Sequence, residues 1–252
     1  MKTQIKHLFL GTSLLVISSI QAQLTFTIEN YQNQELPLAD ILSADFMTGE
    51  ITKWGHIDAN GNASFSLEYD YMEKLLQEAE QQQKDAPEGW TLSFHTVGSK
   101  HECSSYGSEN TIEIENPDAR IFGLPPFFVG EEATQTNHGR MYIASNRDVA
   151  NWLDSYQMDN AATGYYIEWI FVEKESTVKG NCSVLTMTGH QDEEVVISTV
   201  YNLNFEEGWN IMVFSIDEVF NSASGRVFLS KMTVSTSNFF DDDAQVFLIN
   251  DD

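Results

Sequence analysis

Residues 165–172 read YYIEWIFV, a nearly continuous run of apolar and aromatic side chains. A run of this length and composition predicts a central β-strand. Further strands with one apolar face are expected after it, at residues 195–203, 211–216 and 227–234. Turn sequences at residues 206–208 and 222–225 separate these strands. Short strands with turns at such regular spacing predict an antiparallel meander that closes into a sandwich or a barrel.

The sequence before residue 117 also predicts strands. Residues 24–28, 63–69 and 111–115 alternate apolar and polar side chains, as a half-buried strand requires. Asn60-Gly61 lies between the expected strands 51–57 and 63–69. This dipeptide tolerates positive φ angles, so it predicts a hairpin turn.

Two short helices are expected among these strands. Apolar residues from Met72 to Ala79 follow helical spacing, and Asp70 with Glu73 three positions later is typical of a capping box. This helix is expected to cover one side of a sheet. A second helix is expected at residues 146–156, with Val149, Trp152, Leu153 and Tyr156 on its buried face.

The sequence Asn116-Pro117-Asp118 is the best candidate for a domain boundary, because proline interrupts both helices and strand ladders. We therefore expect an all-β protein, mainly antiparallel, with two short helices. The expected organisation is a signal peptide at residues 1–22, an N-terminal β-sandwich module with an inserted helix at residues 23–116, and an antiparallel β-sandwich or barrel module at residues 117–252.

The N-terminal segment has the features of a secretory signal peptide. Lys2 and Lys6 precede an almost uncharged apolar stretch at residues 8–20, and Ala22 supplies the small residue expected before a cleavage site. The apolar stretch is shorter than the roughly 20 residues that a membrane-spanning helix needs. We expect cleavage after Ala22, no transmembrane segment in the mature chain, and export to a periplasmic, cell-surface-associated or extracellular location.

Composition excludes several functional classes. The chain of 252 residues has 13 basic and 38 acidic residues, a formal net charge of −25, which disfavours nucleic-acid binding and electrostatic attachment to a membrane surface. A hydrophobic fraction of 42% is sufficient for a folded core. Cys103 and Cys182 are the two cysteines, and in an exported protein such a pair predicts a disulfide.

The run ITKWGHIDANGNASFSL at residues 51–67 resembles the hairpin of transthyretin-like, carboxypeptidase-regulatory-like β-sandwich modules. The resemblance covers most of the N-terminal module, and the helix expected near residues 70–84 departs from the family pattern. A second run, YNLNFEEGWNIMVFSI at residues 201–216, is similar to a strand–turn–strand segment of uncharacterised exported proteins from Gram-negative bacteria. These resemblances imply β-structure and export, and they bring no catalytic residues.

The sequence predicts no metal centre. Asp58, Asn60 and Asn62 have the spacing of a calcium loop, but Ala63 and Tyr69 occupy the positions where an EF-hand needs glycine and glutamate. The acidic run at residues 241–243 is typical of a solvated turn. Zinc needs three or four converging ligands, and the chain has no H-E-x-x-H motif.

The sequence also shows no catalytic motif. It lacks a G-x-S-x-G elbow, a P-loop and a dinucleotide-binding fingerprint. We expect no catalytic residue and no cofactor. Trp54, Trp90 and Trp209 lie at expected strand starts or turns, where exposed rings would stack on a ligand or anchor a partner.

These observations favour an exported, non-enzymatic binding or scaffolding protein at the bacterial cell periphery, with a protein or carbohydrate partner. Two alternatives remain open. One is a secreted hydrolase with a glycosidase-like pair of carboxylates, since many acidic residues are available. The other is a carrier that holds a small apolar ligand in its C-terminal β-module.

Overall fold

The computed structural model describes residues 22–29, 31, 39–44, 49–67, 70–89, 93–103, 109–134, 136–238 and 243–250. The expected signal peptide before Ala22, the expected ligand-stacking residue Trp90, and most of the acidic run at residues 241–243 lie outside the described residues.

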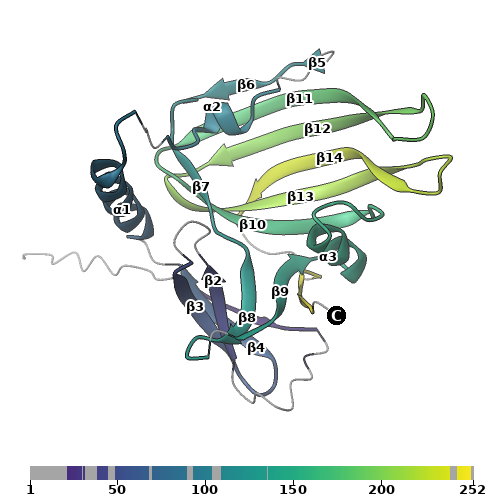
Figure 1. Cartoon of the computed structure of the whole chain (residues 1–252). Helices are drawn as coiled ribbons and strands as arrows, with labels where there is room; N and C mark the ends of the chain where they lie inside the picture. Colours follow the sequence, from purple (N-terminus) through teal and green to yellow (C-terminus); the bar gives the residue numbers. More distant parts are fainter. Residues whose placement is uncertain are drawn as a thin grey trace, which may run out of the picture.

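Fifteen strands and three helices form the described chain (Figure 1). The helices are α1 (Tyr71–Asp85), α2 (Val97–Lys100) and α3 (Arg147–Asp154). The strands are β1 (Ala22–Thr27), β2 (Ala39–Ala44), β3 (Ile51–Ile57), β4 (Asn62–Leu67), β5 (Glu109–Asn110), β6 (Glu113–Glu115), β7 (Ile121–Gly123), β8 (Phe127–Glu131), β9 (Thr136–Ala144), β10 (Gly164–Val172), β11 (Ser176–Met187), β12 (Glu194–Phe205), β13 (Gly208–Asn221), β14 (Val227–Ser237) and β15 (Gln245–Ile249). The all-β class, mainly antiparallel with few short helices, is confirmed.

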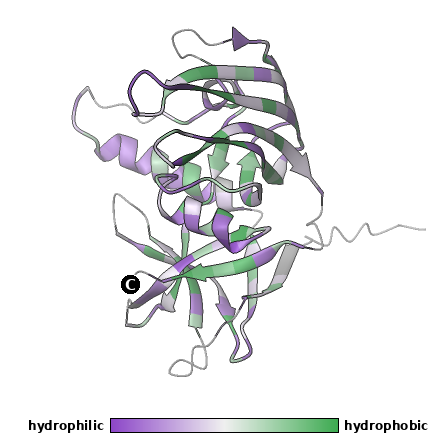
Figure 2. Cartoon of the chain, turned by 90° about the vertical axis from the view of Figure 1, so that its right-hand side faces the viewer, coloured by the Kyte–Doolittle hydropathy of each residue, from purple (hydrophilic) through white to green (hydrophobic). Residues whose placement is uncertain are grey.

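Hydrogen bonds join the strands into one path in the order β1-β4-β3-β2-β8-β9-β10-β13-β14-β12-β11-β5, with β15 beside β9, β6 beside β11 and β7 beside β10. Figure 1 shows two parts of this path. The upper sheet is formed by β10 to β14, and the lower group by β1 to β4, β8, β9 and β15. Figure 2 shows that the strongly hydrophobic stretches lie on the strands.

The two parts interleave along the chain. β1 to β4, β8 and β9 belong to the lower group, whereas β5, β6 and β7 pair with strands of the upper sheet. Strands on both sides of the expected boundary at residue 116 therefore share one sheet. The boundary sequence itself is hydrogen-bonded, since Gly98 N donates to Pro117 O at 2.8 Å and Asn116 Nδ2 donates to Glu175 O at 2.9 Å.

One connection differs from the expected meander. β14 lies between β12 and β13, and it runs parallel to β12. In the turn between β12 and β13, the side chain of Asn210 accepts from Glu206 N at 2.9 Å and donates to Glu206 O and Gly208 O, so these backbone groups are satisfied locally.

β10 is the central strand that the sequence predicted. Ile167 and Trp169 face the core between the upper sheet and the lower group. Ile170 and Val172 face a second core on the opposite side of the sheet, beneath α2 and β7. Tyr166 joins a third cluster beneath α3. Burial on both faces explains the nearly continuous apolar sequence of this strand.

Both expected helices are present, with one correction at the start of α1. Asp70 makes no side-chain capping bond, because its backbone (φ −88°, ψ 7°) lacks the extended conformation of a cap. α3 begins as expected, with Asn146 accepting from Val149 N and Trp152 buried. α2 is a third helix, which the sequence did not predict; its Thr96 and Ser99 form a capping box.

The expected turn at Asn60-Gly61 is confirmed between β3 and β4. Gly61 has φ +81°, the left-handed conformation that favours glycine. Asp58 accepts from Asn60 N at 2.8 Å, and from Asn62 N and Nδ2 at 2.9 Å and 2.8 Å. Its carboxylate is therefore occupied by the turn, which agrees with the structural interpretation of this acidic motif.

Candidate functional site

A cavity lies where the sheet opens beside β10. On this side β10 pairs with β9 only at Tyr166, opposite Ala144, and with β7 only from Ile170 to Val172. No described strand pairs here with residues 167–169. The reason is visible in the connection from β7 to β8, because Pro125 and Pro126 cannot donate to a ladder and the chain leaves β10 at this point.

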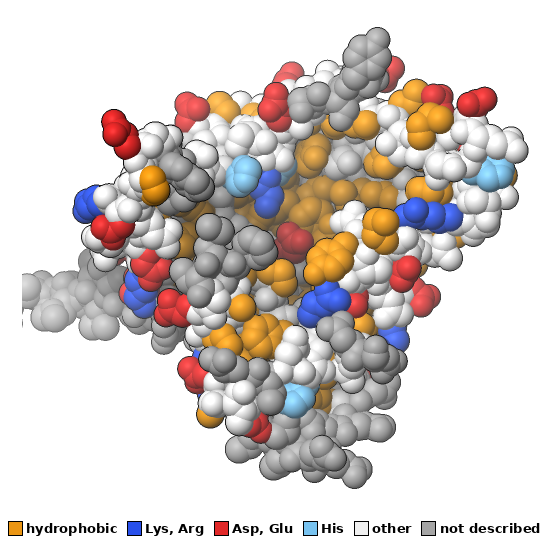
Figure 3. Space-filling view, viewed as in Figure 1, with side chains coloured by type: hydrophobic (Ala, Val, Ile, Leu, Met, Phe, Trp, Pro, Cys, Tyr) orange, Lys and Arg blue, Asp and Glu red, His pale blue; other side chains and the backbone are white. Residues whose placement is uncertain are grey.

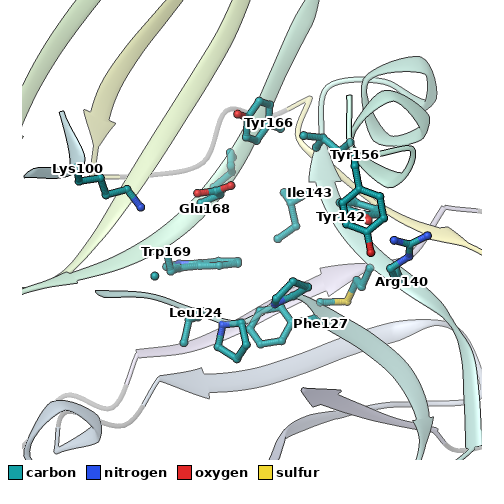
Figure 4. A pocket seen from close by; sticks show the side chains of 16 residues that line it. Lys100, Leu124, Phe127, Arg140, Tyr142, Ile143, Tyr156, Tyr166, Glu168 and Trp169 are labelled. Atoms are coloured by element: carbon teal, nitrogen blue, oxygen red, sulfur yellow. The ribbon is translucent and has the colours of Figure 1, made fainter. Parts of the chain in front are cut away.

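The resulting pocket has a volume of about 370 Å³. Figure 3 shows hydrophobic side chains gathered in the hollow between the upper sheet and the lower group. Apolar and aromatic side chains form most of the wall, among them Leu124, Phe127, Met141, Ile143, Ile167 and Trp169. Lys100, Arg140, Tyr142, Tyr156, Tyr166 and Glu168 supply the polar groups (Figure 4).

Glu168 is the one acidic residue among those that line the pocket. Its side chain is accessible from the cavity, and Figure 4 places its carboxylate between Tyr166 and Trp169. Within the described chain, no hydrogen bond or ion pair engages this carboxylate. The surrounding protein removes water from it and raises its pKa above the ordinary value, and the positive charge of Lys100 opposes this shift.

Tyr166 stands beside Glu168 in the wall. Its ring stacks on Phe214 of β13 with centroids 4.6 Å apart and planes parallel within 1°. Burial first, and then the nearby charge of Glu168, raise the pKa of the Tyr166 phenol, so this group stays a neutral hydrogen-bonding group at physiological pH.

An ion pair closes the opposite end of the pocket. Arg140 Nε lies 2.9 Å from Asp154 Oδ1, and Arg140 Nη2 donates to Asp154 Oδ2 at 3.1 Å. Tyr142 Oη donates to the same Oδ1 at 3.1 Å. Burial, followed by the charge of Asp154, raises the pKa of Tyr142. This network joins β9 to the last turn of α3 and pairs the charge of Arg140.

Tyr156 lies at the pocket mouth just after α3. The guanidinium of Arg140 lies 5.2 Å from the centre of its ring. Tyr156 and Gln157 have φ angles of 53° and 64°, a left-handed conformation that ends the helix, and Tyr156 is 80% exposed. The sequence-based assignment of Tyr156 to the buried face of the second helix was therefore wrong, because the helix ends two residues before it.

Trp54 and Trp209, two of the aromatic residues expected to bind a ligand, do not line this pocket. Trp54 is buried in the core, and its Nε1 donates to Ser43 Oγ at 2.8 Å. A β-bulge explains this, since Ile41 pairs with Gly55 and Leu42 pairs with Lys53, which turns Trp54 inward. Trp209 is half-buried between Tyr71 and Phe171, with centroid distances of 5.4 Å to each ring.

The expected disulfide between Cys103 and Cys182 is present, with Cα atoms 5.7 Å apart. It joins the segment after α2 to β11, close to the pairing of β5 with β11. Among the residues that the structure describes, no three His, Cys, Asp or Glu side chains lie together as a metal site. None of the described helices is long and apolar enough to cross a membrane.

The sequence contains one signal for the pocket that our prediction missed. Glu168 is the only charged residue in the apolar run of β10. Glu168 is also exposed between the buried residues Ile167 and Trp169, so its carboxylate is available to water or to a ligand. No protein-family model, curated protein or solved structure matches this chain. The functional argument therefore depends on the geometry of the pocket.

Proposed function

We propose that this is an exported, non-enzymatic binding protein that holds a small, mostly apolar ligand in the pocket beside β10. The observation that carries the proposal is a cavity of about 370 Å³ with apolar walls and one unengaged carboxylate, Glu168. Ligand sites of proteins commonly have volumes of roughly 300–1,000 Å³, apolar walls and a few convergent polar groups. The signal-like N-terminus and the disulfide support export.

Two features favour binding over hydrolysis. The residues that line the pocket include one carboxylate, whereas a glycosidase uses two carboxyl groups across its cleft. Tyr142 and Tyr166 of the wall have raised pKa values, which keeps their phenols neutral and unsuited to serve as bases near neutral pH. A carrier of a small apolar ligand requires an apolar cavity, and this pocket is one. It lies at the border of the upper sheet.

Gly123 offers a way to test the proposal without removing core atoms. It pairs with Ile170, so a side chain there would share a sheet face with Ile170 and Glu168. A Cβ added to Gly123 meets no atom within 4 Å, and the residue lines the pocket. A large side chain at this position is therefore expected to fill the cavity.

The experiment is a fluorescence titration of the disulfide-bonded protein with Nile red, a neutral apolar dye. We expect saturable binding of one dye per chain, retention of binding in Gly123→Ala, and loss in Gly123→Phe with unchanged thermal stability. Equal binding by both variants would place the dye elsewhere and refute the proposed site. Absence of saturable binding to the unmodified protein would refute the proposed function.

A further inference from the structure

We infer that the ligand of this pocket is an amphiphilic cation, an apolar body that carries one ammonium group in contact with the Glu168 carboxylate. This inference rests on the proposed function, and it specifies the chemical class of the ligand. Three independent features of the described residues support it: the state of Glu168, the pairing of the neighbouring cations, and the aromatic character of the wall.

The first feature is the carboxylate itself. Glu168 stands opposite Met212 of β13 and points into the cavity in Figure 4, with the ring of Trp169 below it. It has no hydrogen-bonding or ion-pairing partner within the described chain. Glu168 is exposed to the cavity, but the protein around it removes part of its hydration, and a charged or hydrogen-bonding partner would make up for that loss. An ammonium group supplies both the opposite charge and the donors.

The second feature is that neither Arg140 nor Lys100 forms an ion pair with Glu168. The guanidinium of Arg140 is paired with Asp154 at the other end of the cavity. Lys100 is exposed at the end of α2, and it acts on Glu168 through space without forming an ion pair with it. A bound ammonium would therefore become the closest cation to Glu168.

The third feature is the remainder of the wall. Tyr156, Tyr166, Trp169 and Phe127 surround the cavity, and aromatic faces attract cations while they also accommodate apolar chains. The net charge of −25 raises the local concentration of cations and repels anions. An anionic amphiphile would meet Glu168 with the same charge, so it is expected to bind most weakly.

The test displaces Nile red with three ligands that share one alkyl chain: octylamine, octanol and octanoate. At neutral pH the amine is cationic, the alcohol is neutral and octanoate is anionic. We expect octylamine to compete about tenfold better than octanol, as a charge-assisted hydrogen bond would allow, and octanoate to compete worst.

Three variants test whether the preference for octylamine arises from Glu168 in the pocket. In Glu168→Gln, octylamine and octanol are expected to compete equally, while the affinity for octanol stays as in the unmodified protein. In Lys100→Met, removal of the competing cation is expected to strengthen octylamine binding severalfold. Glu218→Gln removes the same charge from an exposed pair with Lys231, so it controls for net charge and is expected to change nothing.

The outcomes separate the two proposals. If Nile red binds in the pocket but octanol or octanoate competes as well as octylamine, the cationic ligand is excluded and the binding function stands. If Glu168→Gln does not fold, the order of the three ligands on the unmodified protein still decides. If Nile red shows no saturable binding, the proposed function and this inference both fail.

Discussion

Arg140 and Asp154 face each other through two contacts, Nε to Oδ1 at 2.9 Å and Nη2 to Oδ2 at 3.1 Å, across the joint between β9 and α3. Both side chains are about one-fifth exposed, at 22% and 17%, so water screens the pair only partly. The pair therefore stabilises the packing of α3 against β9, and Asp154 neutralises the positive charge of Arg140 at the pocket.

Replacement of Asp154 by alanine is expected to affect stability and binding together. We expect the free energy of unfolding to fall by about 2–3 kcal/mol, because Arg140 and the hydroxyl of Tyr142 lose their partner in a half-buried site. Octylamine should also bind more weakly, since Asp154 no longer neutralises the positive charge of Arg140 at the pocket. Urea unfolding and dye displacement measure the two effects. Lys231→Ala breaks an exposed pair and should cost below about 1 kcal/mol; equal costs would contradict this account.

Removal of the disulfide is expected to destabilise the fold. Cys103 and Cys182 are 79 positions apart, and the chain-entropy model gives about 4–5 kcal/mol for such a loop. The double variant Cys103→Ser, Cys182→Ser should therefore unfold at lower urea concentration than the oxidised protein. Addition of dithiothreitol should lower the stability of the unmodified protein and leave the double variant unchanged. Two thiols that react with a label in the denatured, non-reduced protein would contradict the pairing.

Trp54 is expected to act in stability instead of ligand binding. Substitution Trp54→Phe removes the donor to the buried Ser43 hydroxyl, and we expect a loss of about 1–3 kcal/mol in the free energy of unfolding. Ser43→Ala in the Trp54→Phe background should restore part of that loss, because the unpaired hydroxyl is gone. Nile red binding should persist. A variant that keeps its stability but loses the dye would instead place Trp54 in the ligand site.

The pair between Arg120 and Glu173 predicts a pH-dependent contribution to stability. The hydrogen bond from Arg120 holds the pKa of Glu173 below its ordinary value of 4.5. The contribution is complete above the pKa of the unfolded chain, and it is lost as the pH falls through the lower pKa of the folded protein. Glu173 is 39% exposed, so we expect at most about 1 kcal/mol.

The difference in unfolding free energy between the unmodified protein and Glu173→Gln measures this contribution. It should be constant from about pH 7 to pH 5 and should shrink below the ordinary pKa of glutamate. A difference that grows on acidification would show that the carboxylate is not stabilised by Arg120.

Processing of the N-terminus is expected to remove residues 1–22. The charged start, the short apolar stretch and Ala22 together predict a mature chain that begins at Gln23. Mass spectrometry of the protein recovered from the periplasm or medium of a bacterial host measures this directly. A membrane-bound product that retains residues 1–22 would refute both the cleavage site and export by this route.

Local patterns were sufficient for much of the fold. The hairpin around Asn60-Gly61, the central strand at residues 165–172 and the helix that buries Trp152 all follow from side-chain periodicity and turn chemistry. The insertion of β14 between β12 and β13 was not predictable in this way. It depends on pairing between residues far apart in sequence, such as Thr199 with Met232.

The pocket could not be predicted for the same reason. Its position depends on where β7 and β9 separate from β10. Pro125-Pro126 and Glu168 mark this place in the sequence, but only the strand pairings show that they come together. Trp54 shows the same limit on a smaller scale. Its position in the sequence suggests exposure, but one bulge against β2 turns its ring into the core.

The pairing of β15 has a consequence for how the polypeptide acquires its structure. β15 completes β9, and Val246 bridges Ile28, so segments near the two extremities of the described chain meet in the lower group. The ribosome delivers a polypeptide from its N-terminus onward. The lower group therefore stays incomplete, with an unoccupied strand position beside β9, until residues 245–249 have been synthesised. During that interval the edge of β9 has unpaired backbone groups that could pair with another chain. We therefore expect a chaperone that covers this edge to raise the yield of folded protein.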